Sequence, residues 1–187
     1  MSSSCSLVCL LVSLGLVLVF GACVPENLAQ THESITDVLK LKEPEVGKRP
    51  LFGSVIKSIN TSCQRKEQVQ LMNRTLDIYA HIFSSILQHN QHQTHDNNGS
   101  PALLEHLSEN SRSQVQMDLM KLQQKMENLK RRLNRLHHQQ PNYEDVLSQL
   151  NKIKVDDALD QRKALAEFNE VYQAACVITS HHCGSSH

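Results

Sequence analysis

The sequence predicts an all-α fold, and three observations support that prediction. Apolar residues recur at intervals of three and four over several long segments, as one buried face of an α-helix requires. No stretch alternates apolar and polar residues for the length of a strand. Breaker residues, among them Pro44, Gly47, Pro50 and Pro141, separate the periodic segments. We therefore expect a bundle of about six helices joined by short polar turns.

Residues 1–23 have the composition of a secretory signal peptide. The stretch 7–20 is uncharged and nearly all apolar, but it is shorter than the ~20 residues of a membrane span. Small residues follow at positions 21 to 23, as a signal-peptidase site requires. A buried N-terminal helix of a cytosolic protein is the alternative. We expect a secreted chain, not inserted in a membrane after cleavage, with a signal peptide over 1–23, a helical domain over 24–176 and a flexible tail over 177–187.

The first predicted elements of the mature chain are short. Ser34, with Asp37 three residues on, resembles a capping box and predicts a helix over 34–42. The breaker-rich stretch 43–50 is expected to be a connection, and a short helix follows it over 51–60.

Segment 64–90 predicts the central helix of the bundle. Its apolar stripe covers about half of the helix circumference at ~100° per residue, so this helix should contact neighbours on several sides. The stripe consists of Val69, Leu71, Met72, Leu76, Ile78, Tyr79, Ile82, Phe83 and Ile86. After a polar stretch, Ser100 and Pro101 should start a short helical piece over 102–107.

Segment 112–136 has the most regular pattern, with apolar residues spaced as the a and d positions of a heptad. They are Val115, Leu119, Leu122, Met126, Leu129, Leu133 and Leu136. The segment is either one core-facing helix of a bundle or a coiled-coil contact with a second chain, and we favour the first. Basic residues at its end match the helix dipole, with a receptor or sulfated-glycan contact as the alternative. They are Lys130, Arg131, Arg132 and Arg135.

Two further helices are expected near the C-terminus. The stretch 143–153 predicts a short helix after Pro141. Asp156 or Asp157 can cap the last helix. The inner face of that helix is expected to consist of Leu165, Phe168, Tyr172 and Ala175.

Composition and motifs give no support for an enzyme, a cofactor or a nucleic-acid ligand. The 19 Lys and Arg residues balance 19 Asp and Glu residues, and Trp is absent. The chain has no Gly-rich phosphate loop, HExxH, CxxC or GxSxG motif. Histidines at 89, 92 and 95, at 137 and 138, and at 181, 182 and 187 are an alternative metal-binding set. We expect no metal, because the first group completes no defined site and adjacent ligands near Cys183 strain tetrahedral geometry.

Secretion bears on the sequons and the cysteines. Asn60, Asn73 and Asn98 each start an Asn-x-Ser/Thr sequon and are candidate glycosylation sites if exposed. Cys176 and Cys183 could form a disulfide in an oxidising compartment. Pairing of Cys63 with either of them, or an intermolecular bond, remains open.

The segment 161–168, QRKALAEF, resembles the interferon-gamma signature of the final helix. The matching residues are Gln161, Arg162, Lys163, Ala164, Glu167 and Phe168. The leader, the length and the helix order agree with that family, and the details resemble a fish member. Two features depart from it: Asp160 replaces an aliphatic residue, and no Lys or Arg follows Cys176 where the family has a basic tail. The chain therefore looks closer to a fish interferon-gamma-related branch without that tail.

The resemblance implies a cytokine that activates immune cells through a two-chain class II cytokine receptor and JAK–STAT signalling. It implies a six-helix subunit that interlocks with its twin as a homodimer. It places receptor contacts near 35–50, and we expect Glu45, Lys48 and Arg49 to take part. The signature itself we interpret as packing rather than receptor contact, since Ala164 and Phe168 lie near one helix face. The alternative function is a secreted carrier of lipid or a small apolar ligand.

Overall fold

The computed structural model describes residues 25–62, 64–88, 103–136 and 144–180, with only the backbone of 144–146. Within these ranges every regular element is a helix, which confirms the predicted all-α class. The helices are α2 (Glu26–Thr36), α3 (Pro44–Gly47), α4 (Gly53–Thr61), α5 (Arg65–Gln88), α6 (Glu109–Asn134), α7 (Glu144–Leu150), α8 (Ala158–Ala166) and α9 (Phe168–Ser180). Among the described helices, none is long and apolar enough to cross a membrane.

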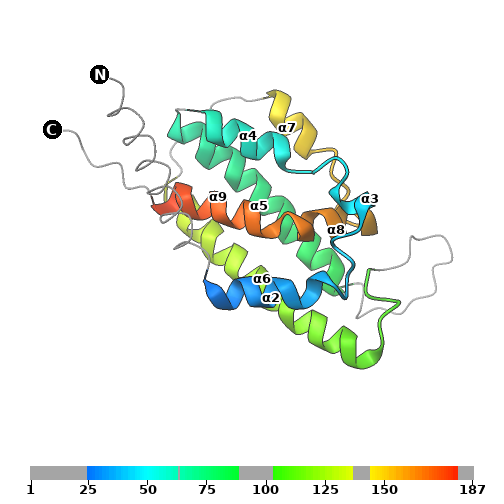
Figure 1. Ribbon diagram of the computed structural model, residues 1–187. Helices are drawn as coiled ribbons and strands as arrows, with labels where there is room; N and C mark the ends of the chain where they lie inside the picture. Colours follow the sequence, from blue (N-terminus) through cyan, green and yellow to red (C-terminus); the bar gives the residue numbers. More distant parts are fainter. Residues whose placement is uncertain (1–24, 63, 89–102, 137–143, 181–187) are drawn as a thin grey trace, which may run out of the picture.

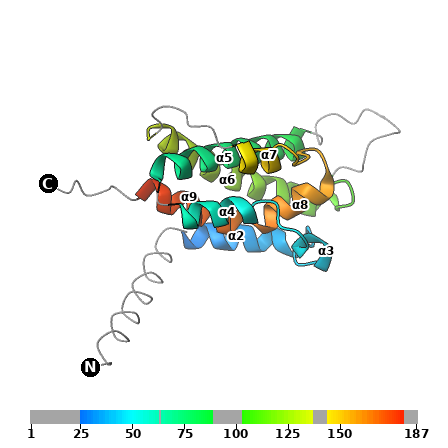
Figure 2. The ribbon, with the colours of Figure 1, turned by 90° about the horizontal axis from the view of Figure 1, so that it is seen from above.

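Helix α5 is the central element of the bundle. It packs most extensively against α6 and also contacts α4, α7, α8 and α9. Figure 1 shows α2 and α6 together on one side of it and α4 and α7 on the other, and Figure 2 shows the same assembly from above. All nine residues of the broad apolar stripe predicted for this segment are buried. The prediction of a central helix is therefore confirmed.

The heptad positions of α6 face the core of their own chain. The six residues from Val115 to Leu133 are at most 3 % exposed, and Leu136 packs partly buried against the core. Contacts of α6 with α2, α5 and α9 cover this face. The core-facing interpretation is therefore confirmed, and the seam is filled without a second chain.

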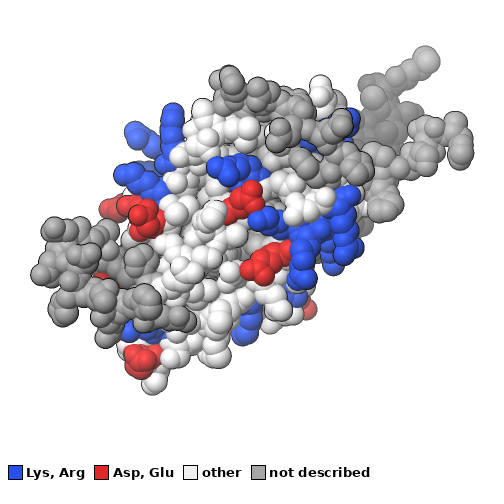
Figure 3. Space-filling model, turned by 180° about the vertical axis from the view of Figure 1, so that it is seen from behind, with Lys and Arg blue, Asp and Glu red and all other residues white. Residues whose placement is uncertain are grey.

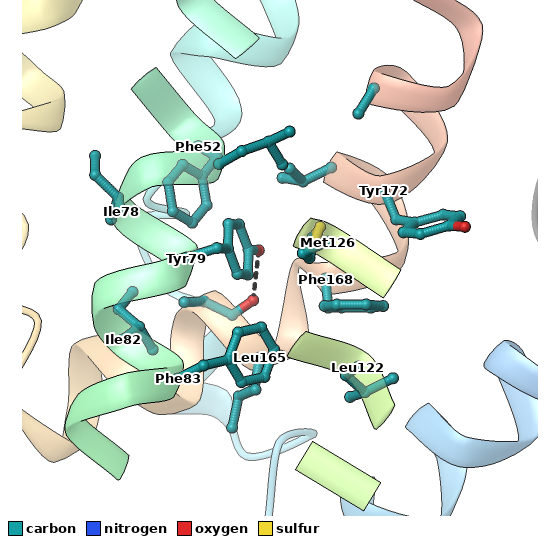
Figure 4. Close-up of a cluster of buried hydrophobic side chains, with 14 of the residues drawn as sticks. Phe52, Ile78, Tyr79, Ile82, Phe83, Leu122, Met126, Leu165, Phe168 and Tyr172 are labelled. Atoms are coloured by element: carbon teal, nitrogen blue, oxygen red, sulfur yellow. Dashed lines mark hydrogen bonds between the residues drawn. The ribbon is translucent and has the colours of Figure 1, made fainter. Parts of the chain in front are cut away.

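An aromatic cluster joins the start of α4, α5 and the start of α9 (Figure 4). Phe52 stacks on Tyr79 with ring centroids 4.9 Å apart. Phe168 meets the edges of Tyr79 and Phe83 at 6.2 Å and stacks on Tyr172 at 5.9 Å. Such aromatic pairs contribute about 0.5–1.5 kcal/mol each beyond the area they bury. The cluster fixes the point where α8 meets α9 against the central helix.

The structure corrects the prediction for the first helix. α2 begins at Glu26 and ends at Thr36, so Ser34 lies in its last turn and is not an N-cap. The Ser34 hydroxyl instead donates to the Asp118 carboxylate on α6, 2.7 Å away. The segment 37–42 is a turn. The periodic signal was weak because two of the buried residues of α2 are polar, His32 and Thr36.

Two further predictions differ from the structure. The stretch 103–106 forms a turn rather than the expected helical piece. The last helix is divided at Glu167 into α8 and α9, and at this residue the side chain accepts backbone amides of a distant segment. The predicted cap is confirmed, since Asp157 accepts hydrogen bonds from the amides of Leu159 and Asp160. Helix α9 continues to Ser180 and so includes residues 177–180, which were expected in the tail.

Candidate functional site

The segment 37–50 forms an exposed loop that runs from the end of α2 to the start of α4. Two of its non-glycine residues, Lys40 and Arg49, have a φ of 55°, in the left-handed region that L-residues rarely adopt. Such conformations persist where the surrounding structure holds them in place. Val46, in the single turn of α3, is 2 % exposed and attaches the middle of the loop to the core.

Arg162 of α8 holds the first half of this loop. Its Nε donates to the Leu39 carbonyl at 3.0 Å and its Nη2 to the Lys40 carbonyl at 2.6 Å. The same Nη2 donates to Glu43 Oε2 at 2.7 Å. The bond from Arg162 lowers the pKa of Glu43 below its ordinary value. One guanidinium therefore satisfies three acceptors of the loop, including the carbonyl of the strained Lys40.

Glu167 holds the end of the loop from the other side. Its two carboxylate oxygens accept the backbone amides of Leu51 at 2.6 Å and of Phe52 at 2.8 Å. These amides stand just before and at the N-terminus of α4, where the helix leaves amides without intrahelical partners. Burial raises the pKa of Glu167 above its ordinary value, and the two amide donors offset only part of that rise.

The other signature residues are packed inside the same junction. Gln161 is 3 % exposed and its side-chain amide donates to the Val155 carbonyl at 2.9 Å and the Ser85 hydroxyl at 3.2 Å. The backbone carbonyl of the fully buried Ala164 accepts from the Tyr79 hydroxyl at 2.7 Å. Phe168 belongs to the aromatic cluster, and Lys163 is half-buried. The structure thus places the signature in internal contacts, in agreement with its interpretation as packing.

A buried histidine supports the end of α8. His32 of α2 lies with Nε2 2.7 Å from the Leu165 carbonyl, and its Nδ1 lies 3.1 Å from the Asn169 amide nitrogen. Its ring stacks on Phe168 at 5.8 Å. Together, His32 and the Tyr79 hydroxyl give side-chain partners to two carbonyls in the last turn of α8, those of Leu165 and Ala164.

The three residues expected to meet a receptor lie on the outside of the loop. Glu45, Lys48 and Arg49 are all exposed, and each lies within four residues of a buried or clamped position. The loop therefore presents charged side chains on a backbone that is held from behind by α8. Among the described contacts Lys163 forms no ion pair with Glu167, whose carboxylate oxygens accept the amides of Leu51 and Phe52.

The basic end of α6 is partly neutralised. Lys130 pairs with Asp77 of α5 at 2.5 Å, and Arg131 donates to the Asn128 side chain. Arg132 and Arg135 are exposed. Figure 3 shows a larger group of basic side chains at one edge of the rear face and a smaller group at the opposite edge, with acidic side chains beside both.

The sequons occupy different environments. Asn60 is exposed in the last turn of α4, whereas Asn73 is half-buried in the middle of α5. Asn98 lies outside the described residues. Cys176 is buried in α9, while Cys63 and Cys183 lie outside the described residues, so their predicted pairing stays a prediction.

The three histidine groups considered as metal ligands all lie outside the described residues. Within the described ranges, no group of three or more His, Cys, Asp or Glu side chains is arranged to hold a metal ion. Comparison with protein-family models, with curated proteins and with solved structures finds no match to this chain.

Proposed function

We propose that the chain is a secreted interferon-gamma-like cytokine that binds a class II cytokine receptor and activates immune cells through JAK–STAT signalling. The proposal rests on the resemblance of 161–168 to the interferon-gamma signature and on the leader-like residues 1–23. It includes the six-helix cytokine arrangement and a homodimer as the active form.

One structural observation favours this proposal over other roles for a helical bundle. The signature residue Arg162 holds the first half of the loop 37–50, and Glu167 holds the backbone directly after the loop, at Leu51 and Phe52. The loop that the resemblance implicates in receptor contact is thereby presented as a fixed charged surface. Fixing a contact surface in advance lowers the entropy cost of binding and so favours affinity. The signature and the contact loop are then parts of one device, which explains why inward-facing residues accompany the function.

The test is receptor binding by the purified full chain together with STAT phosphorylation in receptor-bearing cells. We expect charge reversal of Glu45, Lys48 and Arg49 to abolish both responses while leaving the circular dichroism spectrum unchanged. A matched control reverses Lys57, Lys66 and Glu127, which are also exposed, carry the same number of charges of each sign and lie outside both the loop and the basic end of α6. The proposal is refuted if folded protein engages no class II receptor, or if the two triple variants behave alike.

The carrier alternative has no observation in its favour among the described residues. Two hollows on their surface are lined mainly by polar side chains, one between α5, α6 and α7 and one along the outer face of α6. An apolar ligand requires a mainly apolar lining. Native mass spectrometry of the purified protein tests this alternative directly, because a carrier would retain its ligand.

A further inference from the structure

A hollow between α5, α6 and α7 is a polar feature of the described surface that the proposed function does not use. Its volume is about 440 Å³, within the ~300–1,000 Å³ of small-molecule sites. Four of its residues stand on one face of α5 at helical spacing, and the others come from the last turn of α6 and from α7 and its end. The lining consists of Gln70, Asn73, Arg74, Asp77, Asn134, Leu147 and Asn151.

The hollow contains buried hydrogen-bond acceptors that lack partners. Gln70 Oε1 and Asn73 Oδ1 are both buried, and no described residue donates to either. A buried amide oxygen without a donor costs about 1–3 kcal/mol. The walls around them are already fixed, since Arg74 donates to Asn151 Oδ1 at 2.9 Å and Asp77 pairs with Lys130. The two contacts hold the walls of the hollow in place, and the two amide oxygens can each accept a hydrogen bond from a ligand.

The chemistry of the lining indicates the class of ligand. Amide and guanidinium groups suit a compact molecule with many hydroxyl groups, because each hydroxyl both donates and accepts. Among the lining residues that the structure describes, the single carboxylate, Asp77, is neutralised by Lys130, so these residues offer a cation no acidic cluster. Among the described lining residues Leu147 supplies an apolar surface, against which the face of a sugar ring can lie. A saccharide fits this combination better than a metal ion or a lipid.

Asn73 connects this hollow to a covalent source of sugar. It is the acceptor of the sequon Asn73-Arg74-Thr75, so its side chain lines the very hollow that suits a saccharide. A sugar linked to Asn73 is tethered beside the hollow, and tethering gives an effective concentration of about millimolar or more. Even weak contacts between the sugar and the lining residues would then keep the sugar bound in the hollow.

We propose that Asn73 is N-glycosylated and that the first N-acetylglucosamine of its glycan occupies the hollow between α5, α6 and α7. This inference rests on the secretion included in the proposed function. In the modification, Nδ2 of Asn73 forms a bond to C1 of a sugar carried on a lipid diphosphate. The C1–O bond to the diphosphate breaks, the diphosphate leaves with the electron pair, and the nitrogen loses one proton. The seated sugar donates to the unpartnered oxygen of Gln70.

The burial of Thr75 sets the order of events. Its side chain is fully buried and its hydroxyl donates to the Leu71 carbonyl at 2.9 Å. A glycosylating enzyme that reads this hydroxyl cannot reach it in the folded protein. The sugar is therefore attached to the growing chain before α5 packs, and the hollow allows α5 to fold with the sugar in place.

The experiment uses the full chain produced in animal cells, with Asn60 as the internal control. Glycopeptide mass spectrometry should find a glycan on Asn73. Peptide N-glycosidase should release that glycan from the native protein about tenfold or more slowly than the glycan on Asn60, because release requires local opening. After denaturation the two rates should become equal.

Variants that remove lining side chains of the hollow and leave the sequon intact provide a second test. Gln70→Ala combined with Asn151→Ala should bring the native release rate at Asn73 to within about twofold of the rate at Asn60. The control Gln124→Ala, on the exposed outer face of α6, should leave the ratio unchanged. A glycan on Asn60 with a bare Asn73, equal release rates in the native protein, or a double variant without effect would each overturn the inference. None of these results bears on receptor binding, and failure to bind a receptor would not contradict the binding of the sugar in the hollow.

Discussion

Arg162→Ala should release the first half of the loop 37–50 while the bundle stays folded. The guanidinium is 18 % exposed and gives two short hydrogen bonds to main-chain carbonyls, at 3.0 and 2.6 Å. Bonds from a charged donor contribute about 1.5–3 kcal/mol each, and two bonds from one group are not additive, so the loop should lose about 2–3 kcal/mol. The contact with the exposed Glu43 adds little to this energy, because solvent screens the charges.

Hydrogen exchange followed by mass spectrometry measures this loss directly. A loss of 2–3 kcal/mol corresponds to exchange about 30- to 150-fold faster for amides of the loop that are protected by the clamp. Peptides from α5 and α6 should change much less. Arg162→Lys should restore little, because an ammonium group cannot reach diverging carbonyls in the fork geometry of a guanidinium.

Arg112 offers a chemically matched control. Its guanidinium also binds main-chain carbonyls, those of Leu104 at 3.3 Å and Glu105 at 3.1 Å, but in the turn before α6. Arg112→Ala should therefore speed exchange in that turn, leave 37–50 unchanged and leave receptor binding intact. If Arg162→Ala changed exchange evenly over the whole chain, or not at all, the assignment of Arg162 as a local clamp would be wrong.

Three further predictions concern the buried polar contacts. Glu167→Gln should cost about 1–3 kcal/mol of unfolding free energy at pH 7, because the glutamine NH2 group would face the backbone amide of Leu51 or Phe52, which is itself a donor. Burial raises the pKa of Glu167 in the folded protein above its ordinary value of 4.5. The stability advantage of the wild type over this variant should therefore decrease as the pH rises through and above that value. A stability difference that is independent of pH from 4 to 7 in urea titrations would contradict this. Burial opposes ionisation of Asp118, yet hydrogen bonds from Lys121, Gln114 and Ser34 lower its pKa below 3.8. The loss of unfolding free energy caused by Asp118→Asn should therefore shrink as the pH falls below about 4. An equally large loss at pH 2.5 would argue against this. Tyr79→Phe leaves the buried Ala164 carbonyl without its donor and should cost about 1–3 kcal/mol in thermal unfolding; an unchanged melting temperature would show that the bond contributes nothing.

The long helices could be predicted from sequence because their burial patterns are local. The stripe of α5 and the seam of α6 each repeat at helical spacing over about five turns, and every turn adds to the same signal. The start of α2 was missed because His32 and Thr36 occupy buried positions where the pattern expects apolar residues. The break after Ala166 was missed for a different reason, since no Gly or Pro marks it.

The candidate site was predictable only in part. That Glu45, Lys48 and Arg49 lie on the surface agrees with their charge, which makes burial costly. What holds the loop in place could not be predicted, because Arg162 reaches main-chain carbonyls 122 and 123 residues away. A carbonyl belongs to every residue, so such a contact leaves no trace in the residue types. The same holds for Glu167, whose partners are amides 115 and 116 residues away.

This reliance on main-chain atoms gives the loop an evolutionary freedom. Arg162 and Glu167 bind carbonyl and amide groups that remain after nearly any substitution of the residues that carry them. Side chains at positions 45, 48 and 49 can therefore diverge without loosening the anchor. Binding preference and fold stability become separately adjustable traits, as in antibody loops mounted on a constant framework. Under the proposed function, a lineage whose receptor changes can follow it through a few surface substitutions while Arg162 and Glu167 stay the same.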